Sequence, residues 1–127
     1  MAANAHIDLS FCKGLSLQQL YDESAAVLIA VGAKKSRLIP IEGYESKGVI
    51  GGVDFLRDVF TGKEVAVGRK VVVIGGGNVA YDVARTSARL KGVESVTLVC
   101  IESFEEMLAD EVEIEEGAEE GITRING

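Results

Sequence analysis

The sequence predicts an α/β fold in which a parallel sheet is the middle of three layers, and three patterns predict it. Val71–Ile74 is a continuous run of branched apolar residues, as found in parallel strands that are buried on both faces. Ser95–Cys100 is a second run of strand composition. The segment between them has apolar residues at helical spacing, and the order strand, helix, strand is typical of a parallel sheet.

The N-terminal part of the chain contains one predicted helix and one predicted strand. A short polar helix is expected around Leu17 to Tyr21. A buried strand is expected over Ala26–Val31, and it ends at Gly32. This strand is again of the parallel-sheet type, because its residues are all apolar.

Between Lys34 and Lys70 the hydrophobic pattern loosens. This stretch contains the one proline of the chain, together with Gly43 and Gly48, and GGVDFLRDVF within it can form a short helix. We interpret it as a connection between two sheets. The chain is therefore divided into residues 1–33, a connection over residues 34–70, and residues 71–127.

Three consecutive glycines follow the strand that ends at Ile74. Gly75, Gly76 and Gly77 can reverse the chain because no Cβ atom obstructs the turn. Asn78 is the expected N-cap of the next helix, and Gly92 stands where a residue just past its end would lie. The segment is thus predicted to be a strand, a tight turn and a helix.

The turn matches a motif that binds dinucleotides. Gly75, Gly77 and Ala80 fit G-x-G-x-x-A, in which the glycines allow the turn and a close approach of the backbone to a pyrophosphate. Backbone N–H groups at the start of the helix hold the phosphates, so no cationic side chain is needed. Glu102 follows the second strand, 25 residues after Gly77, where a carboxylate can accept hydrogen bonds from the adenosine ribose. We therefore expect a Rossmann-like site in preference to a plain buried turn.

Residues 102–120 contain ten acidic residues and no lysine or arginine. The apolar residues among them recur mostly at helical spacing, which favours an amphipathic helix with a solvated acidic face over a docking surface for a basic partner. Gly121 is expected to end this helix, and Ile122–Ile125 to open another strand. Because the sequence stops there, we expect an incomplete sheet and a fragment of a larger protein.

The composition excludes several classes of partner. A chain of 127 residues can form one ordinary domain. Its net charge of −7 and its pI near 4.7 disfavour nucleic acid and anionic membrane surfaces. Cys12 and Cys100 form neither a C-x-x-C motif nor a zinc-site spacing, and no metal site is predicted. No apolar stretch is long enough to span a bilayer and no signal peptide is evident, so we expect a cytoplasmic protein.

Four separated segments together resemble a known family. They are, in order, YDESAAVLIAVGAKKSRLIPIEG, GGVDFLRDV, GRKVVVIGGGNVAYDVARTSARL and ESFEEMLADEVEIEEGAEEGI. The chain is similar to the two-dinucleotide flavoprotein reductases, and above all to the glutamate synthase small (beta) subunit group. The flavin and nicotinamide domains of dihydropyrimidine dehydrogenase are related to this group. The resemblance extends from about Leu17 to Ile122.

This resemblance implies an FAD-dependent, NAD(P)H-linked oxidoreductase. Residues 1–33 would be a segment of an FAD domain, with Gly32 and Ala33 near the flavin, and residues 71–127 the N-terminal half of an NAD(P)H-binding domain. Hydride would pass from the nicotinamide to flavin N5, so no residue of the chain is expected to be catalytic. Other subunits of an oxidoreductase complex would be partners. The pyrophosphate site would be lined by Gly75, Gly76, Gly77, Asn78 and Val79.

Two departures from the family pattern matter. The N-terminal FAD fingerprint is missing from the sequence, as is a cysteine-rich segment for iron-sulfur clusters, so FAD is expected only in the full-length protein. NADPH-using members commonly have two arginines where this chain has Ile101 and Glu102. A carboxylate repels a 2′-phosphate and accepts from a free ribose, so we predict NAD(H) over NADP(H). Arg85 and Arg89 are expected on the solvated side of the helix, away from the phosphate.

The same residues also allow readings from other classes of protein. Methyltransferases that use S-adenosylmethionine also have a glycine turn, but typically an acidic residue before it, where this chain has Val73 and Ile74. A non-catalytic nucleotide-sensing or subunit-interaction module, in which the acidic helix docks a partner, stays open. A half-built sheet exposes strand edges and apolar faces, so we also expect a homo-oligomer. The sequence does not name the final electron acceptor.

Overall fold

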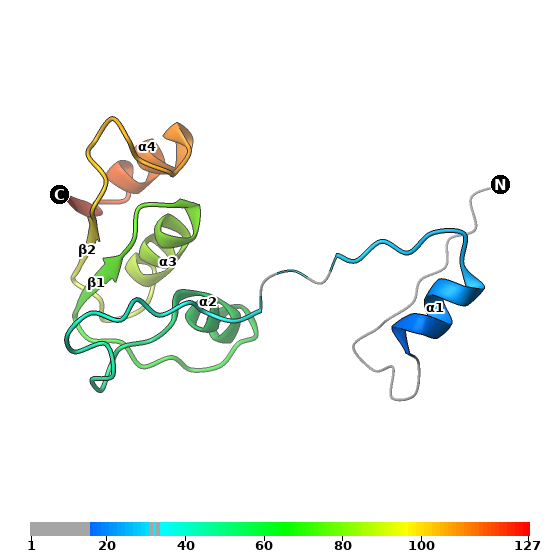
Figure 1. Cartoon of the computed structure of the whole chain (residues 1–127). Helices are drawn as coiled ribbons and strands as arrows, with labels where there is room; N and C mark the ends of the chain where they lie inside the picture. The colour runs from blue at the N-terminus through cyan, green and yellow to red at the C-terminus, as the bar shows by residue number, and fades with distance from the viewer. Residues whose placement is uncertain (1–15, 31, 33) are drawn as a thin grey trace. The chain divides into compact units, whose positions relative to one another are not determined.

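The computed structural model describes residues 16–30, 32 and 34–127. It divides into two compact units, residues 1–32 and residues 33–127, each of which is described by itself. Figure 1 shows the chain with its elements labelled. The units differ in kind, because every strand of the described residues belongs to the second.

The first unit contains one helix, α1, which spans Leu17–Glu23. Ser16 caps it through a reciprocal pair of hydrogen bonds: its Oγ accepts from the backbone N–H of Gln19 at 3.1 Å, and its own N–H donates to Gln19 Oε1 at 2.8 Å. This capping box fixes the start of the helix. The predicted short polar helix is therefore confirmed, with an end two residues later than expected.

The strand predicted over Ala26–Val31 is wrong for the residues that the structure describes. Residues 26–30 pair with no strand, and Leu28 and Ile29 are exposed, whereas Val31 lies outside the described residues. A strand is defined by hydrogen bonds to a neighbour, and among the described residues of its unit this apolar run has no strand with which to form a ladder.

The second unit is built on a three-stranded parallel sheet with the strand order β1-β2-β3. Its strands are β1 (Lys70–Ile74), β2 (Ser95–Cys100) and β3 (Thr123–Asn126). Val73 of β1 is in register with Leu98 of β2, and Leu98 is in register with Arg124 of β3. The predicted α/β class is confirmed, and β2 has the bounds that the sequence indicated.

Helices α3 (Asn78–Ala88) and α4 (Glu111–Glu119) connect the three strands and lie on the same side of the sheet (Figure 1). Alternate residues of β2 point into the layer between sheet and helices. The core of this layer consists of Val73, Tyr81, Ala84, Val96, Leu98, Cys100 and Ala109. The helix predicted from the periodicity after the glycines is confirmed as α3, which packs against β1 and β2.

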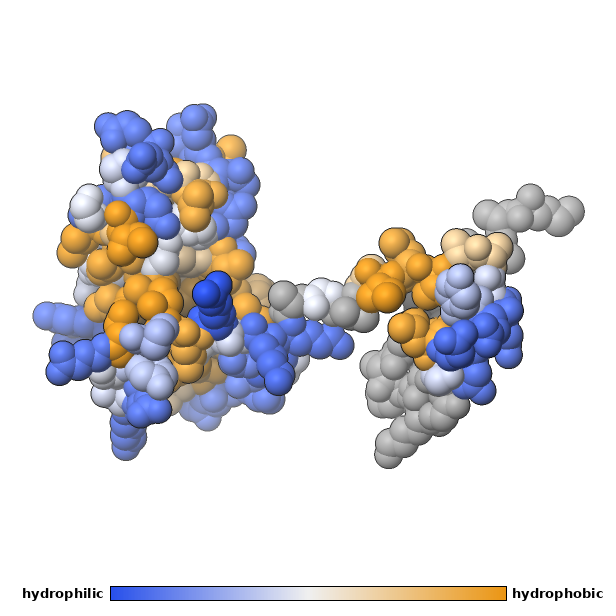
Figure 2. All heavy atoms as spheres, in the orientation of Figure 1, coloured by the Kyte–Doolittle hydropathy of each residue, from blue (hydrophilic) through white to orange (hydrophobic). Residues whose placement is uncertain are grey.

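The opposite face of the sheet is open. Val72 and Ile74 of β1 are 63% and 54% exposed, and Ile125 of β3 is 53% exposed. In Figure 2 apolar residues gather in the region where Figure 1 places β1 and β2. The expectation that β1 is buried on both faces is wrong within the described residues, because they supply helices to one face only. The sheet is an incomplete Rossmann-like sheet, as predicted.

Helix α2 (Gly52–Phe60) confirms the short helix predicted within the connection. It packs against α3, and a Cβ atom built on Gly52 would lie 3.1 Å from Cγ2 of Val83. Phe55 is its buried residue. The helix is also tied to the chain before it, because Ser36 Oγ accepts a hydrogen bond from the backbone N–H of Asp54 at 3.0 Å.

The acidic C-terminal segment is helical over only half of the predicted length. Residues 101–109 form turns, and α4 begins at Glu111 with Asp110 as its N-cap. The backbone of the turns has partners outside a helix, since Asn126 Nδ2 donates to the carbonyl oxygen of Glu102 at 2.8 Å. Gly121, with φ of +79°, follows the end of α4 as predicted.

Candidate functional site

The glycine turn lies at the carboxyl end of β1. Gly75 has φ of +141°, which side chains rarely allow, and its N–H donates to the carbonyl oxygen of Val99 at 2.9 Å. A Cβ atom on Gly75 would lie 3.4 Å from Cβ of Ala80. The strand and the helix therefore approach each other closely through two small residues, as the G-x-G-x-x-A spacing predicts.

The start of α3 presents free backbone donors. Gly77 is the N-cap and Asn78 the first helical residue, so the prediction of Asn78 as N-cap is wrong by one position. Within residues 34–127, the backbone N–H groups of Gly77, Asn78 and Val79 donate to no other backbone group. A Cβ atom on Gly77 would meet nothing within 4 Å. Free N–H groups beside open space at the positive end of a helix suit an anion such as a phosphate.

Glu102 lies directly against the turn. A Cβ atom on Gly76 would be 2.7 Å from Oε2 of Glu102 and 3.1 Å from Cβ of Cys100, so a side chain here would displace the Glu102 carboxylate. The structure thus brings together the glycines and the acid that follows β2, although 26 residues separate Gly76 from Glu102. The carboxylate is partly exposed, which leaves it accessible as a hydrogen-bond acceptor.

The side chain of Asn78 points to α4. Its Nδ2 donates to Oδ2 of Asp110 at 2.7 Å, and its Oδ1 accepts from the backbone N–H of Asp110 at 2.8 Å. The sequence analysis gave Asp110 no role beyond its membership of the acidic stretch. Its position could have been predicted, because aspartate is a common N-cap and Asp110 directly precedes a helical run.

Arg85 of α3 and Arg89 at its C-cap form ion pairs with glutamates of α4 and of its C-cap. Arg85 contacts Glu113 at 2.8 Å, Glu116 at 2.5 Å and Glu120 at 2.9 Å, and Arg89 contacts Glu120 at 2.5 Å. The Arg85 side chain is only 16% exposed, so the prediction that it lies on the solvated side of the helix is wrong. The expected solvated acidic face of α4 is likewise turned, in part, toward α3.

These contacts also fix the protonation of the cluster. Hydrogen bonds to Glu120 and Glu113 raise the pKa of the Arg85 guanidinium. Partial burial raises the pKa of the Glu120 carboxyl, but the hydrogen bonds from Arg85 and Arg89 outweigh it, so this pKa lies below the ordinary 4.5. Both groups are therefore charged at neutral pH. The guanidinium of Arg85 is therefore committed to the glutamates through three of its nitrogens.

The remaining predicted site residues lie elsewhere. Gly32, with φ of +67°, belongs to the first unit, and Ala33 lies outside the described residues. Val79 is half exposed in the first turn of α3. The structure therefore brings together the glycine turn, the start of α3 and Glu102, and the place of Gly32 and Ala33 near a flavin stays a prediction.

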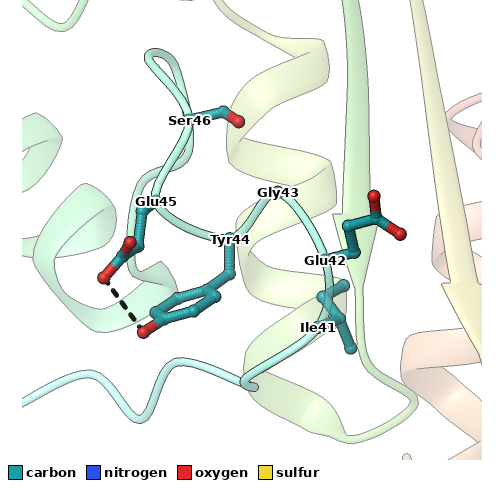
Figure 3. Close-up of a pocket in the computed structure, with 6 residues that line it drawn as sticks. All are labelled: Ile41, Glu42, Gly43, Tyr44, Glu45 and Ser46. Atoms are coloured by element: carbon teal, nitrogen blue, oxygen red, sulfur yellow. Dashed lines mark hydrogen bonds between the residues drawn. The ribbon is translucent and has the colours of Figure 1, made fainter.

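A separate hollow of about 390 Å³ lies in the connection. All six of its lining residues come from the loop Ile41–Ser46, and Tyr44 Oη donates to Glu45 Oε1 at 3.0 Å (Figure 3). It contains no residue of the glycine turn. Among the described residues no cluster of histidine, cysteine and acidic side chains could hold a metal ion, and no helix is long and apolar enough to cross a membrane.

Comparison with known proteins identifies relatives of the chain. The family model described as pyridine nucleotide-disulphide oxidoreductase matches residues 16–123. NADPH-Fe(3+) oxidoreductase subunit beta of Geobacter sulfurreducens is 39% identical over 125 residues, which are 96% of this chain and 18% of the relative.

Two other relatives have different names and similar identity. NAD-dependent dihydropyrimidine dehydrogenase subunit PreT of Escherichia coli is 35% identical over 114 residues, covering 89% of this chain and 27% of the relative. NADP(+)-dependent formate dehydrogenase subunit beta of Moorella thermoacetica is 36% identical over 111 residues, covering 85% of this chain and 16% of the relative. The chain thus spans less than a third of the length of each of these relatives.

Proposed function

The chain belongs to the pyridine nucleotide-disulphide oxidoreductase family, and we propose that residues 71–127 are the N-terminal half of a domain that binds NAD(H). In this proposal the free N–H groups of Gly77, Asn78 and Val79 hold the pyrophosphate. Gly75 and Gly76 allow the backbone to approach it. Glu102 accepts hydrogen bonds from the adenosine ribose hydroxyls.

One observation carries the proposal: the contact between Glu102 and Gly76. It places a carboxylate over the turn at the carboxyl edge of a parallel sheet, where dinucleotides bind in folds of this class. A 2′-phosphate in the same place would meet a negative charge, and Arg85 and Arg89 of the helix after the turn are paired with Glu120. The names of the relatives include both NADPH and NAD, so the preference for NAD(H) rests on the residues of this chain.

The reaction that we propose for the full-length protein is hydride transfer between NAD(H) and FAD. The flavin supplies the redox chemistry when it is bound, and the task of this chain is to orient the dinucleotide. Gly32 and Ala33 are proposed to lie near the flavin in that protein. Within the described residues one glycine-rich turn joins a strand to a helix, so the FAD cradle itself is not formed by them. No side chain of the chain is proposed to be catalytic.

The wider setting is also a proposal. The relatives are named as subunits, which supports an oxidoreductase complex with other subunits as partners. Among such complexes we favour one like glutamate synthase, whose small (beta) subunit the chain resembles. A cytoplasmic setting and a homo-oligomer of this chain are proposed from the sequence.

A calorimetric titration of the chain with NADH and with NADPH at moderate salt tests the proposal. Preferential binding of NADH is expected. A preference for NADPH would overturn the role of Glu102 and leave the turn as a phosphate site. Binding of neither would overturn the proposed function of residues 71–127.

A second candidate is a non-catalytic nucleotide-sensing or subunit-interaction module. The open apolar face of the sheet, with Val72 and Ile74 exposed, favours a role in assembly. The two candidates are separated by combining the chain with the missing flavin-binding portion. NADH-dependent flavin reduction supports the enzyme, whereas NADH binding without reduction supports the module.

A further inference from the structure

We propose that the side chain of Asn78 is a positioning group, which acts on the phosphate site through Asp110 and does not itself touch the dinucleotide. Its side chain fixes the Asp110 carboxylate at the rim of the glycine turn, so that the free N–H groups at the start of α3 stay open to a pyrophosphate. The proposal rests on the proposed function of the turn.

The hydrogen bonds of the pair are complementary in both directions. Asp110 offers one acceptor, Oδ2, and one donor, its backbone N–H, and Asn78 meets both at 2.7 and 2.8 Å. An amide is suited to this arrangement, because it has a donor and an acceptor on the same group. Aspartate at position 78 would lack the donor, and alanine would lack both.

Asp110 gives up a local hydrogen bond to make this contact. It is the N-cap of α4, with extended backbone angles of −62° and 144°, yet its side chain makes no capping hydrogen bond to its own helix. An N-cap aspartate ordinarily accepts from the backbone of the next turn. Here Oδ2 accepts from Asn78 on the other helix. The bridge between the helices therefore determines where this carboxylate lies.

The position of the carboxylate matters because of what lies beside it. Asn78 is the first residue of α3, so Asp110 lies one side chain away from the free N–H groups of Gly77, Asn78 and Val79. The positive end of a helix attracts carboxylates as well as phosphates. A released Asp110 would compete with the pyrophosphate for the same donors. Held by Asn78, it is fixed at the rim.

The test is an exchange of the two side chains in the full chain. Asn78→Asp places two carboxylates against each other, and we expect the affinity for both NADH and NADPH to fall about tenfold, as for loss of a hydrogen bond to a charged group. The ratio of the two affinities should stay unchanged, because Glu102 is untouched. The double variant Asn78→Asp with Asp110→Asn restores one donor and one acceptor, and should recover most of the affinity.

Further variants separate this role from a loss of folding. Asn78→Ala removes the bridge without adding a charge, suits the first turn of a helix, and should weaken both dinucleotides. Glu119→Gln changes the charge of α4 at an exposed position and should leave both affinities as in the wild type. The melting temperature of each variant, followed by circular dichroism, shows whether it is folded.

The outcomes are distinct. Wild-type affinity in Asn78→Asp overturns the proposal, as does a folded double variant that recovers no affinity. A changed ratio of NADH to NADPH affinity in Asn78→Asp would assign the residue to the ribose end and overturn it as well. If the wild-type chain binds neither dinucleotide, both the proposed function of the turn and the positioning role of Asn78 are overturned.

Discussion

Gly117 of α4 lies against the ring of Tyr81 of α3 so closely that no side chain fits between them. A Cβ atom on Gly117 would be 2.8 Å from Cε1 and 2.9 Å from Cδ1 of the ring. Tyr81 is 2% exposed, and its hydroxyl accepts from Arg124 Nη1 at 3.3 Å, so the ring has little room to move. A glycine in the middle of a helix is thus required by packing. The contact also places α4, whose N-cap is Asp110.

Gly117→Ala should therefore destabilise the protein although alanine favours helices. Overpacking costs about 1–3 kcal/mol, and helix propensity returns about 1 kcal/mol, so we expect a net loss of about 1 kcal/mol. Urea unfolding measures it. Glu119→Ala, on the exposed side of the same helix, is the control and should not lose stability. A stabilised Gly117→Ala variant would show that α4 is not packed on Tyr81.

Ser36→Ala should loosen the start of α2. Gly51, the N-cap of α2, has no side chain to accept from the first turn, and Ser36 Oγ accepts from the Asp54 N–H in its place. Loss of a capping side chain costs about 1 kcal/mol. Ser46→Ala, in the loop of Figure 3, is a matched control with no such bond in residues 34–127. Equal unfolding midpoints for the two variants would contradict the cap.

The ion cluster between α3 and α4 predicts a loss of stability in acid. The pKa of Glu120 is lowered in the folded chain, so its contribution is fully present above the ordinary pKa of 4.5 and is lost as the pH falls through the lower, folded value. Glu120→Gln should flatten the fall of the melting temperature below about pH 4.5. Glu119→Gln should leave the slope as in the wild type. Identical slopes in both variants would contradict the pairing.

The open face of the sheet predicts association of the chain with itself. Ile74→Thr keeps a β-branched residue in β1 but removes apolar surface, so it should weaken association without unfolding the strand. Sedimentation equilibrium measures the mass. Phe60→Ser, at a still more exposed apolar position on α2, is the control. A wild-type chain that is monomeric at high concentration would contradict the prediction.

Much of the second unit could be predicted because its signals are local. The bounds of β2 and the end of α4 at Gly121 follow from short patterns of apolar residues and glycine. The glycine turn and the spacing of Glu102 similarly predicted which residues the parallel sheet brings to one edge. These features depend on neighbours in sequence, or on the simple rule that carboxyl ends of parallel strands meet.

The errors concern contacts between distant segments. The strand expected over residues 26–31 needed a partner strand, which its own composition cannot supply. The predicted helix at residues 102–109 gave way to turns, in which the carbonyl oxygen of Glu102 accepts from the distant Asn126. Pairing of Arg85 with three glutamates, and of Asn78 with Asp110, joins residues 28 to 35 positions apart. No periodic pattern reports such pairs.

The central claim, that Glu102 on the glycine turn selects NAD(H), is tested most directly by one ratio. It is the dissociation constant for NADPH divided by that for NADH, measured by calorimetry in the wild type, in Glu102→Gln and in Glu119→Gln. We predict a ratio well above one in the wild type and in Glu119→Gln, and a ratio about tenfold lower in Glu102→Gln, as expected when a charged acceptor is lost. A wild-type ratio of one or less, or an unchanged ratio in Glu102→Gln, would contradict the account.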